Sequence, residues 1–150
     1  MSITQTVSVV KKAVVRICTS VNNQINAYGT GFLVTSDGYV FTCEHVIRDL
    51  IQNNLKVLVF LESNLGNYLT FDAKILVHDR EHDFAILKIE GENLPFLPLG
   101  NYNSVQEGDE AIFSGYPLSV PRVTTHRCTI SAKGNDLISP KKINMMQIDG

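Results

Sequence analysis

Short β-rich runs separated by turn residues constrain the fold of this chain more than any other feature of its sequence. Runs dense in Val, Ile, Phe, Tyr and Thr recur along its whole length, and Gly, Asn, Asp or Pro stands between almost all of them. They cover residues 13–20, 28–36, 39–43, 55–62, 68–79, 84–90, 109–116, 122–134 and 142–149. About nine strands with almost no helix predict an all-β antiparallel barrel or sandwich.

One helix and one tight turn can be placed with definite residues. Ile3, Val7 and Val10 recur at helical spacing behind a possible cap at Ser2 or Thr4, which predicts a short leading helix over residues 3–12. Asp37-Gly38 between two β-rich runs predicts a hairpin turn, because glycine tolerates the positive φ of such turns.

Composition and charge exclude several classes of function. The chain has 150 residues, 44% hydrophobic and 19% charged, which is typical of a globular domain with a substantial core. Its formal net charge is -2 and no window holds a dense run of Lys or Arg, so we expect no nucleic-acid partner. No apolar run approaches the roughly 18 residues of a membrane span, and we expect no membrane partner either.

The cysteines and the first residues predict a cytoplasmic location. Cys18, Cys43 and Cys128 are odd in number and far apart, unlike a disulfide framework or a zinc site. Lys11 and Lys12 interrupt the early apolar stretch, which differs from a secretory signal.

Two residues, His45 and Asp83, could carry chemistry together. Each alone has an ordinary explanation, since His45 could cap a turn at a strand end and Asp83 could cap a strand start in solvent. As a pair they fit acid–base catalysis, in which a carboxylate accepts the second ring proton of a histidine that acts as general base. Such a pair needs a nucleophile as its third member.

Two segments resemble the HtrA/Deg type of trypsin-like serine protease. GTGFLVTSDGYVFTCEHVI resembles the family's Gly-x-Gly-Phe strand, its Asp-Gly-Tyr turn and its Thr-x-x-His-Val end. Thr42, His45 and Val46 occupy the Thr, His and Val positions of that last motif. HDFAILKIE resembles the strand that carries the family's catalytic aspartate, which assigns that role to Asp83. The resemblance therefore implies that His45 and Asp83 are the catalytic pair.

Later motifs follow the family's order and imply its architecture. Leu99-Gly100, Gly108-Asp109 and Gly115-Tyr116-Pro117 match its Leu-Gly, Gly-Asp and Gly-x-Pro steps, and MMQIDG is similar to the run before its active-site loop. The implied fold is a trypsin-like double antiparallel β-barrel with the first barrel complete and the second partial. We expect residues 1–92 to form the leading helix and first barrel, 93–109 a linker, and 110–150 the partial second barrel.

The implied activity is peptide-bond hydrolysis by Ser-His-Asp acyl transfer on a peptide or unfolded protein, with no cofactor and no metal. His45 would be the general base and then the general acid, and Asp83 would orient it. In the family the nucleophile lies in a loop several residues beyond the position of Asp149, whereas this sequence stops at Gly150. We therefore expect a fragment that lacks the serine and is inactive alone, with a further segment or chain completing the second barrel.

Other interpretations remain open at this point. The chain could be a non-catalytic module that binds a peptide by strand addition or serves as a scaffold. A zinc site of His78, His82 and Asp83, with His45 nearby in space, is disfavoured because His78 and His82 do not share a helix face. Cys43 is expected to be a small buried residue, although a cysteine nucleophile in the absent loop is a known variant of the fold.

Overall fold

The computed structural model describes residues 1–117, 120–134 and 144–149. The chain divides into two compact units. The first comprises Met1–Pro98 with Gly115–Thr124, and the second comprises Leu99–Ser114 with Thr125–Gly150. The domain boundaries expected at residues 92 and 109 stay a prediction.

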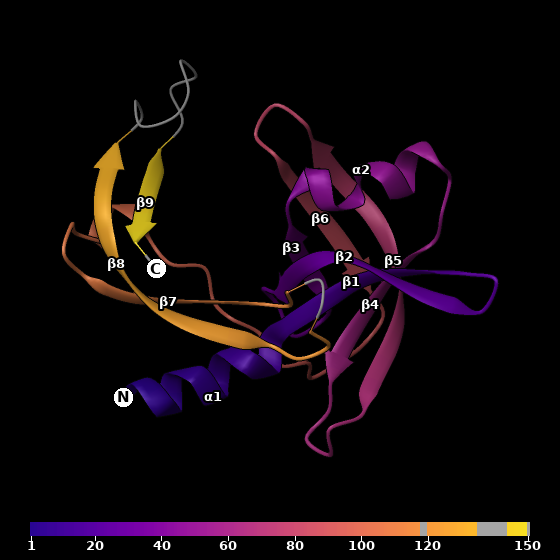
Figure 1. Ribbon diagram of the computed structural model, residues 1–150, viewed down its shortest axis with the longest axis horizontal. Helices are drawn as coiled ribbons and strands as arrows, with labels where there is room; N and C mark the ends of the chain where they lie inside the picture. The colour runs from indigo at the N-terminus through magenta and orange to yellow at the C-terminus, as the bar shows by residue number, and fades with distance from the viewer. Residues whose placement is uncertain (118–119, 135–143, 150) are drawn as a thin grey trace. The chain divides into compact units, whose positions relative to one another are not determined.

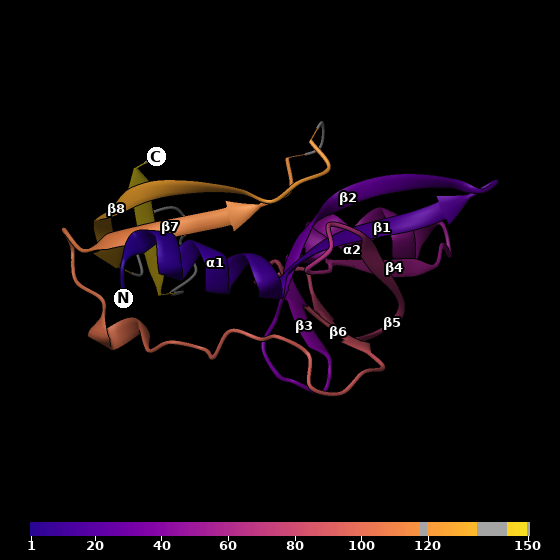
Figure 2. The ribbon, with the colours of Figure 1, turned by 90° about the horizontal axis from the view of Figure 1, so that it is seen from below.

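Six strands of the first unit close into an antiparallel barrel (Figure 1). The order around the barrel is β1-β2-β3-β6-β5-β4, and Figure 2 shows the same strands from below. The elements are α1 (Ile3–Ala13), β1 (Val14–Val21), β2 (Gln24–Leu33), β3 (Tyr39–Thr42), α2 (Glu44–Gln52), β4 (Val57–Glu62), β5 (Tyr68–Asp79) and β6 (Phe84–Ile89). The expected first barrel and leading helix are confirmed.

The leading helix starts at a reciprocal cap. The Ser2 hydroxyl accepts a hydrogen bond from the backbone N–H of Gln5, and the Gln5 side chain accepts one from the N–H of Ser2. Together they satisfy two N–H groups that have no partner within the helix. Lys11 and Lys12 lie in the last turn, where positive charge suits the helix dipole.

Tight turns fix how successive strands follow one another. Asn22 and Asn23, with φ of 51° and 63°, form the left-handed turn that joins β1 to β2. Gly38 has φ +104°, and a Cβ built on it would lie 2.1 Å from the carbonyl oxygen of Ile89. Only glycine fits at position 38, which is why the predicted Asp37-Gly38 turn can dock on β6.

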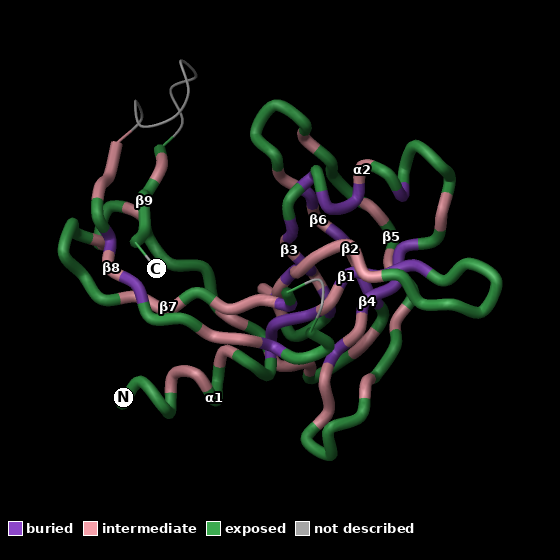
Figure 3. The backbone as a smooth tube through the Cα atoms, in the orientation of Figure 1, coloured by how far each residue is buried: buried purple, intermediate pink, exposed green. Residues whose placement is uncertain are grey.

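Apolar side chains from the barrel strands and from α2 form one core. Figure 3 shows buried segments along the barrel strands and exposed segments at the loops. Leu33, Ile47 and Leu87 are fully buried in this core, so α2 packs on the barrel through the same cluster. Burying such a side chain contributes about 1.5–3 kcal/mol.

Helix α2 departs from the expectation of almost no helix after the leading one. Its apolar residues Val46, Ile47 and Leu50 are spaced for one face of a helix, and all three are buried. The segment is only nine residues long and follows a strand directly, so its periodicity was too short to separate from a strand end.

The second unit holds a three-stranded sheet. Its strands are β7 (Glu110–Gly115), β8 (Thr124–Gly134) and β9 (Met145–Asp149), in the order β7-β8-β9 after the short turn η1 (Tyr102–Ser104). Lys133 ties this turn to the sheet, because its ammonium donates 2.8 Å to the carbonyl of Tyr102 and lies 4.3 Å from that ring's centre. This sheet matches the expected partial second barrel. No helix in the described ranges is long and apolar enough to span a membrane.

Candidate active site

Strand register brings the two predicted catalytic residues together. Strand β3 pairs antiparallel with β6, and Thr42 at the end of β3 lies opposite Ala85 near the start of β6. The residues that follow β3 and those that precede β6 are therefore neighbours. His45 and Asp83 occupy these positions, 38 residues apart in sequence.

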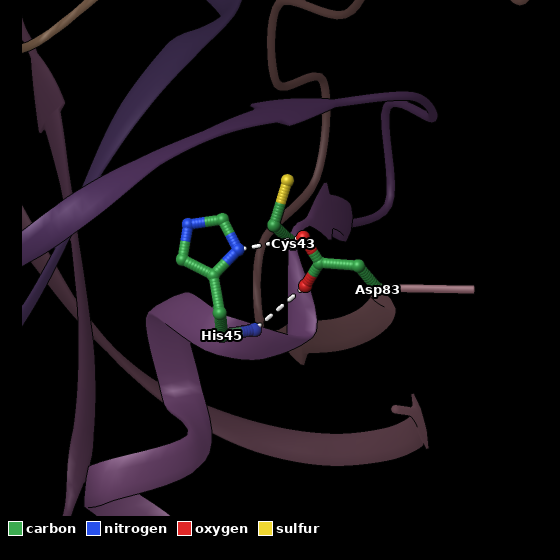
Figure 4. Close-up of side chains that lie close together, drawn as sticks. All are labelled: Cys43, His45 and Asp83. Carbon is green, nitrogen blue, oxygen red and sulfur yellow. Dashed lines mark hydrogen bonds and ion pairs between the residues drawn. The ribbon is translucent and has the colours of Figure 1, made fainter. Parts of the chain in front are cut away.

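His45 binds Asp83 through two hydrogen bonds (Figure 4). The backbone N–H of His45 donates 2.8 Å to Oδ1, and the ring Nδ1 lies 2.6 Å from Oδ2. An ionised carboxylate can only accept, so the proton of this contact belongs to Nδ1. In the neutral ring Nε2 then carries a lone pair and can accept a proton.

The pair is open to solvent, yet Asp83 is held in its charged form. The side chains of His45 and Asp83 are 60% and 46% exposed. Burial tends to raise the pKa of Asp83, but the two hydrogen bonds from His45 and the charges of His45 and Arg48 outweigh it, so this pKa is lower than usual.

Asp83 adopts a backbone conformation that is uncommon outside glycine. Its φ is +51°, in the left-handed region that Asp tolerates better than most residues. The N–H of His45 belongs to the first turn of α2 and has no partner inside the helix. Oδ1 of Asp83 supplies that partner, so the same contact holds the strained loop and completes the helix start.

Packing around the start of α2 fixes the position of His45. A Cβ on Gly29 would lie 2.7 Å from Cγ2 of Val46, so the absence of a side chain lets the helix approach β2. The hydroxyl of Thr42 donates 2.8 Å to the carbonyl of Thr30 and ties β3 to β2.

An ion pair between the buried Glu44 and the partly exposed Arg48 supports the same helix turn. Glu44 is 4% exposed and lies 2.5 Å from the guanidinium of Arg48, one turn later. The hydrogen bond from Arg48 lowers the pKa of Glu44 against the opposing effect of burial. Sequence analysis missed this pair, although Glu and Arg four residues apart after a strand end are a recognisable signal.

The other histidines near Asp83 have different partners. Nδ1 of His82 lies 2.6 Å from Oδ2 of Asp79, and its N–H donates 3.1 Å to Oδ1, which repeats the pattern of the first pair. His78 is exposed on β5. The structure therefore does not bring His78, His82 and Asp83 together as one metal site.

The exposure of Cys43 differs from the expectation, and Gly31 shows how closely the neighbouring strands pack. The expectation that Cys43 is buried is wrong, since its side chain is exposed. Cys43 follows the last residue of β3, where the chain leaves the barrel. A Cβ on Gly31 would lie 2.9 Å from the carbonyl oxygen of Phe41, so the absence of a side chain there lets β2 and β3 approach closely.

The chain combines an antiparallel six-stranded barrel with a carboxylate-bound histidine at the adjacent ends of β3 and β6, as expected for a trypsin-like peptidase. Comparison with known families agrees, because residues 29–150 match the family described as "Trypsin-like peptidase domain". The chain belongs to this family. Its relatives and structural neighbours are of the DegP and HtrA types, which confirms the HtrA/Deg resemblance.

The curated relatives are bacterial serine endoproteases. The chain is 39% identical over 108 residues to "Probable periplasmic serine endoprotease DegP-like" of Chlamydia trachomatis serovar D, covering 72% of this chain and 20% of the relative. It is 31% identical over 126 residues to the protein of that name in Pseudomonas putida, covering 84% and 24%. The chain thus spans about a fifth to a quarter of these relatives.

Solved structures of HtrA-type proteins share the fold. "HtrA-type protease AlgW with tripeptide" superposes with a TM-score of 0.76 at 26% identity, covering 98% of this chain and 46% of that one. "Crystal structure of Deg5" superposes with a TM-score of 0.76 at 25% identity, covering 99% and 75%.

The expected cytoplasmic location is wrong. Both relatives reported above carry the name "Probable periplasmic serine endoprotease DegP-like", which points to the periplasm. An odd set of separated cysteines and the absence of a recognisable signal in these residues do not identify a compartment.

Proposed function

We propose that this chain supplies the general base and its orienting acid to a Ser-His-Asp peptidase, with His45 and Asp83 in these roles. The observation that carries the proposal is the double hydrogen bond between them, which fixes the ring tautomer and leaves Nε2 free. Membership of the trypsin-like peptidase family supports the same assignment.

Each residue has a defined task in acyl transfer. Nε2 of His45 takes the proton of an attacking hydroxyl and later gives it to the leaving amine. Asp83 keeps the ring in position and stabilises the imidazolium that forms, and its lowered pKa keeps it ionised near neutral pH.

The nucleophile is a serine carried outside the 150 residues. Among the residues that the structure describes, no serine hydroxyl is hydrogen-bonded to His45. The 150-residue chain alone is accordingly expected to be inactive, and a further segment or chain would add the serine and complete the second barrel.

The substrate is a peptide or unfolded protein, and the compartment is the periplasm. The structural neighbour AlgW is in complex with a tripeptide, and the relatives are named periplasmic endoproteases.

The test is hydrolysis of an unfolded protein by the longer polypeptide that contains this chain and a serine loop. We expect His45→Ala to lower kcat/KM by about 10³- to 10⁶-fold and to abolish fluorophosphonate labelling of the serine. His82→Ala is the matched control, because it removes an imidazole with the same two contacts to a neighbouring aspartate. It should change kcat/KM by no more than about twofold.

Two outcomes would overturn the proposal. Full activity in His45→Ala would remove that residue from the chemistry. A wild-type polypeptide that is neither active nor labelled, but binds the unfolded protein, would indicate a peptide-binding module instead.

A further inference from the structure

A thiol lies beside the proposed catalytic pair. Cys43, His45 and Asp83 each offer one metal-ligating atom, and these atoms all lie within 4.8 Å of one another. All three residues are exposed, and Figure 4 shows their side chains gathered at the start of α2. Within the described part of the chain, no other three Cys, His, Asp or Glu residues form such a group.

We propose that these three residues form an inhibitory Zn²⁺ site, an inference that rests on the proposed function of the pair. Thiolate, imidazole and carboxylate are the three kinds of side chain that zinc prefers, and three protein ligands with one open position is a common zinc arrangement. Ligand atoms on one tetrahedral zinc stand about 3–4 Å apart, given bond lengths near 2.0–2.3 Å. Small side-chain rotations of exposed residues would close the present spacing.

The thiol distinguishes this place from the second histidine–aspartate pair. His82 and Asp79 make the same two hydrogen bonds, yet no cysteine joins them in a three-residue group in the ranges that the structure describes. Two exposed ligands bind zinc weakly, whereas a thiolate as third ligand supplies the charge and softness that zinc favours. Cys43 is thus the residue that would make the site.

Metal binding would block the base whichever ring nitrogen it uses. Nε2 points away from Asp83 in the present ring orientation, so a zinc shared by Nε2 and Asp83 requires the ring to turn over, and the metal then occupies the lone pair that accepts the proton. At Nδ1 it replaces the proton now shared with Asp83, and the neutral ring then carries its proton on Nε2. In both cases the Cys43 thiol loses its proton to solvent, the ring keeps one proton, and no oxidation or reduction occurs.

The test measures metal binding directly on the 150-residue chain, with Co²⁺ as the spectroscopic probe and Zn²⁺ as its competitor. We expect tetrahedral visible bands, a thiolate-to-cobalt charge-transfer band and loss of both on adding Zn²⁺. Cys43→Ala should lose the charge-transfer band. It should also weaken Co²⁺ binding by at least roughly 10- to 100-fold, because that is the cost of losing a residue that only supports a metal ligand. His82→Ala should bind as wild type does.

A second measurement does not depend on any variant. Zn²⁺ should slow alkylation of Cys43 by iodoacetamide, mapped by mass spectrometry, with the buried Cys18 and Cys128 as internal references. Unprotected alkylation together with an unchanged cobalt spectrum in Cys43→Ala would overturn the site. Because neither readout needs peptidase activity, failure of the site leaves the proposed function standing. Binding without inhibition of the longer, active polypeptide would overturn only the inhibitory role.

Discussion

At the residue scale, Asp83 joins catalysis to local stability. Its carboxylate accepts one hydrogen bond from the backbone and one from the ring of His45. The first contact satisfies an amide at the start of α2, and the second sets the tautomer of the ring. The charge of Asp83 therefore affects both the fold of its loop and the proposed base.

Stability should depend on pH through this carboxylate. The pKa of Asp83 is lower in the folded chain than its ordinary value, so its contribution is fully present above about pH 4 and is lost as pH falls through the lower folded pKa. We expect Asp83→Asn to cost about 0.2–1 kcal/mol of unfolding free energy at pH 7, the range for exposed pairs, and less at lower pH. Urea unfolding of the wild type and of Asp83→Asn at several pH values between about 2 and 7 measures the difference in unfolding free energy.

A second variant checks the reasoning. The pKa of Asp79 is lowered by its side-chain hydrogen bond with His82, so Asp79→Asn should show the same trend with pH. A stability difference for Asp83→Asn that stays constant as pH falls would contradict the assigned charge.

Glycine at position 38 should tolerate no side chain. We expect Gly38→Ala to cost more than the roughly 1–2 kcal/mol of a left-handed alanine, because its Cβ would also strike the carbonyl oxygen of Ile89. Gly66→Ala is the matched control, since Gly66 has φ +78° and nothing within 4 Å of the added Cβ. Chemical denaturation of both variants gives the comparison, and equal losses would refute the role of the clash.

At the element scale, α2 positions the histidine. The helix begins one residue after β3, and its first turn is hydrogen-bonded to Asp83 and packs against Gly29 of β2. His45 is thereby placed by a helix end and two strands. A site built on such elements keeps its geometry better than one built on a loop.

The contact between Gly29 and Val46 should be coupled to activity. We expect Gly29→Ala to destabilise the chain by about 1–3 kcal/mol, because its Cβ overlaps Val46, and to lower activity of the longer polypeptide by moving His45. Adding Val46→Ala makes room, so the double variant should recover about 0.5–3 kcal/mol relative to the sum of the single variants. Denaturant titration of all four proteins gives this coupling energy, and strict additivity would contradict the packing argument.

Elements with strong local signals could be predicted from the sequence, whereas those that depend on tertiary contacts could not. Strand β5 has the predicted limits, since its β-rich run is long and bounded by turns. Helix α2 was missed because nine residues carry too little periodicity. The motif match predicted His45 and Asp83, but exposure of Cys43 depends on where β3 ends relative to α2, which no local pattern records.

At the scale of the whole molecule, the two units differ in how their strands are protected. The barrel of the first unit is closed, so each of its strands has two neighbours and covers a continuous core. In the described part of the second unit, β7 and β9 each pair with β8 alone. Open strand edges and few buried side chains lower the free energy needed for local opening.

Amide hydrogen exchange should therefore separate the units. We expect β1 to β6 to exchange slowly, by opening that approaches global unfolding, and β9 to exchange faster, by local opening.

Leu87 is fully buried in the barrel core, and Leu87→Ala should cost about 2–5 kcal/mol and speed exchange in the barrel strands. Ile130→Ala, in β8, is the reciprocal variant and should act first on β8 and β9. Mass spectrometry of peptides from both units follows the change. Equal acceleration throughout the chain in both variants would mean that the barrel and the three-stranded sheet unfold as one cooperative structure.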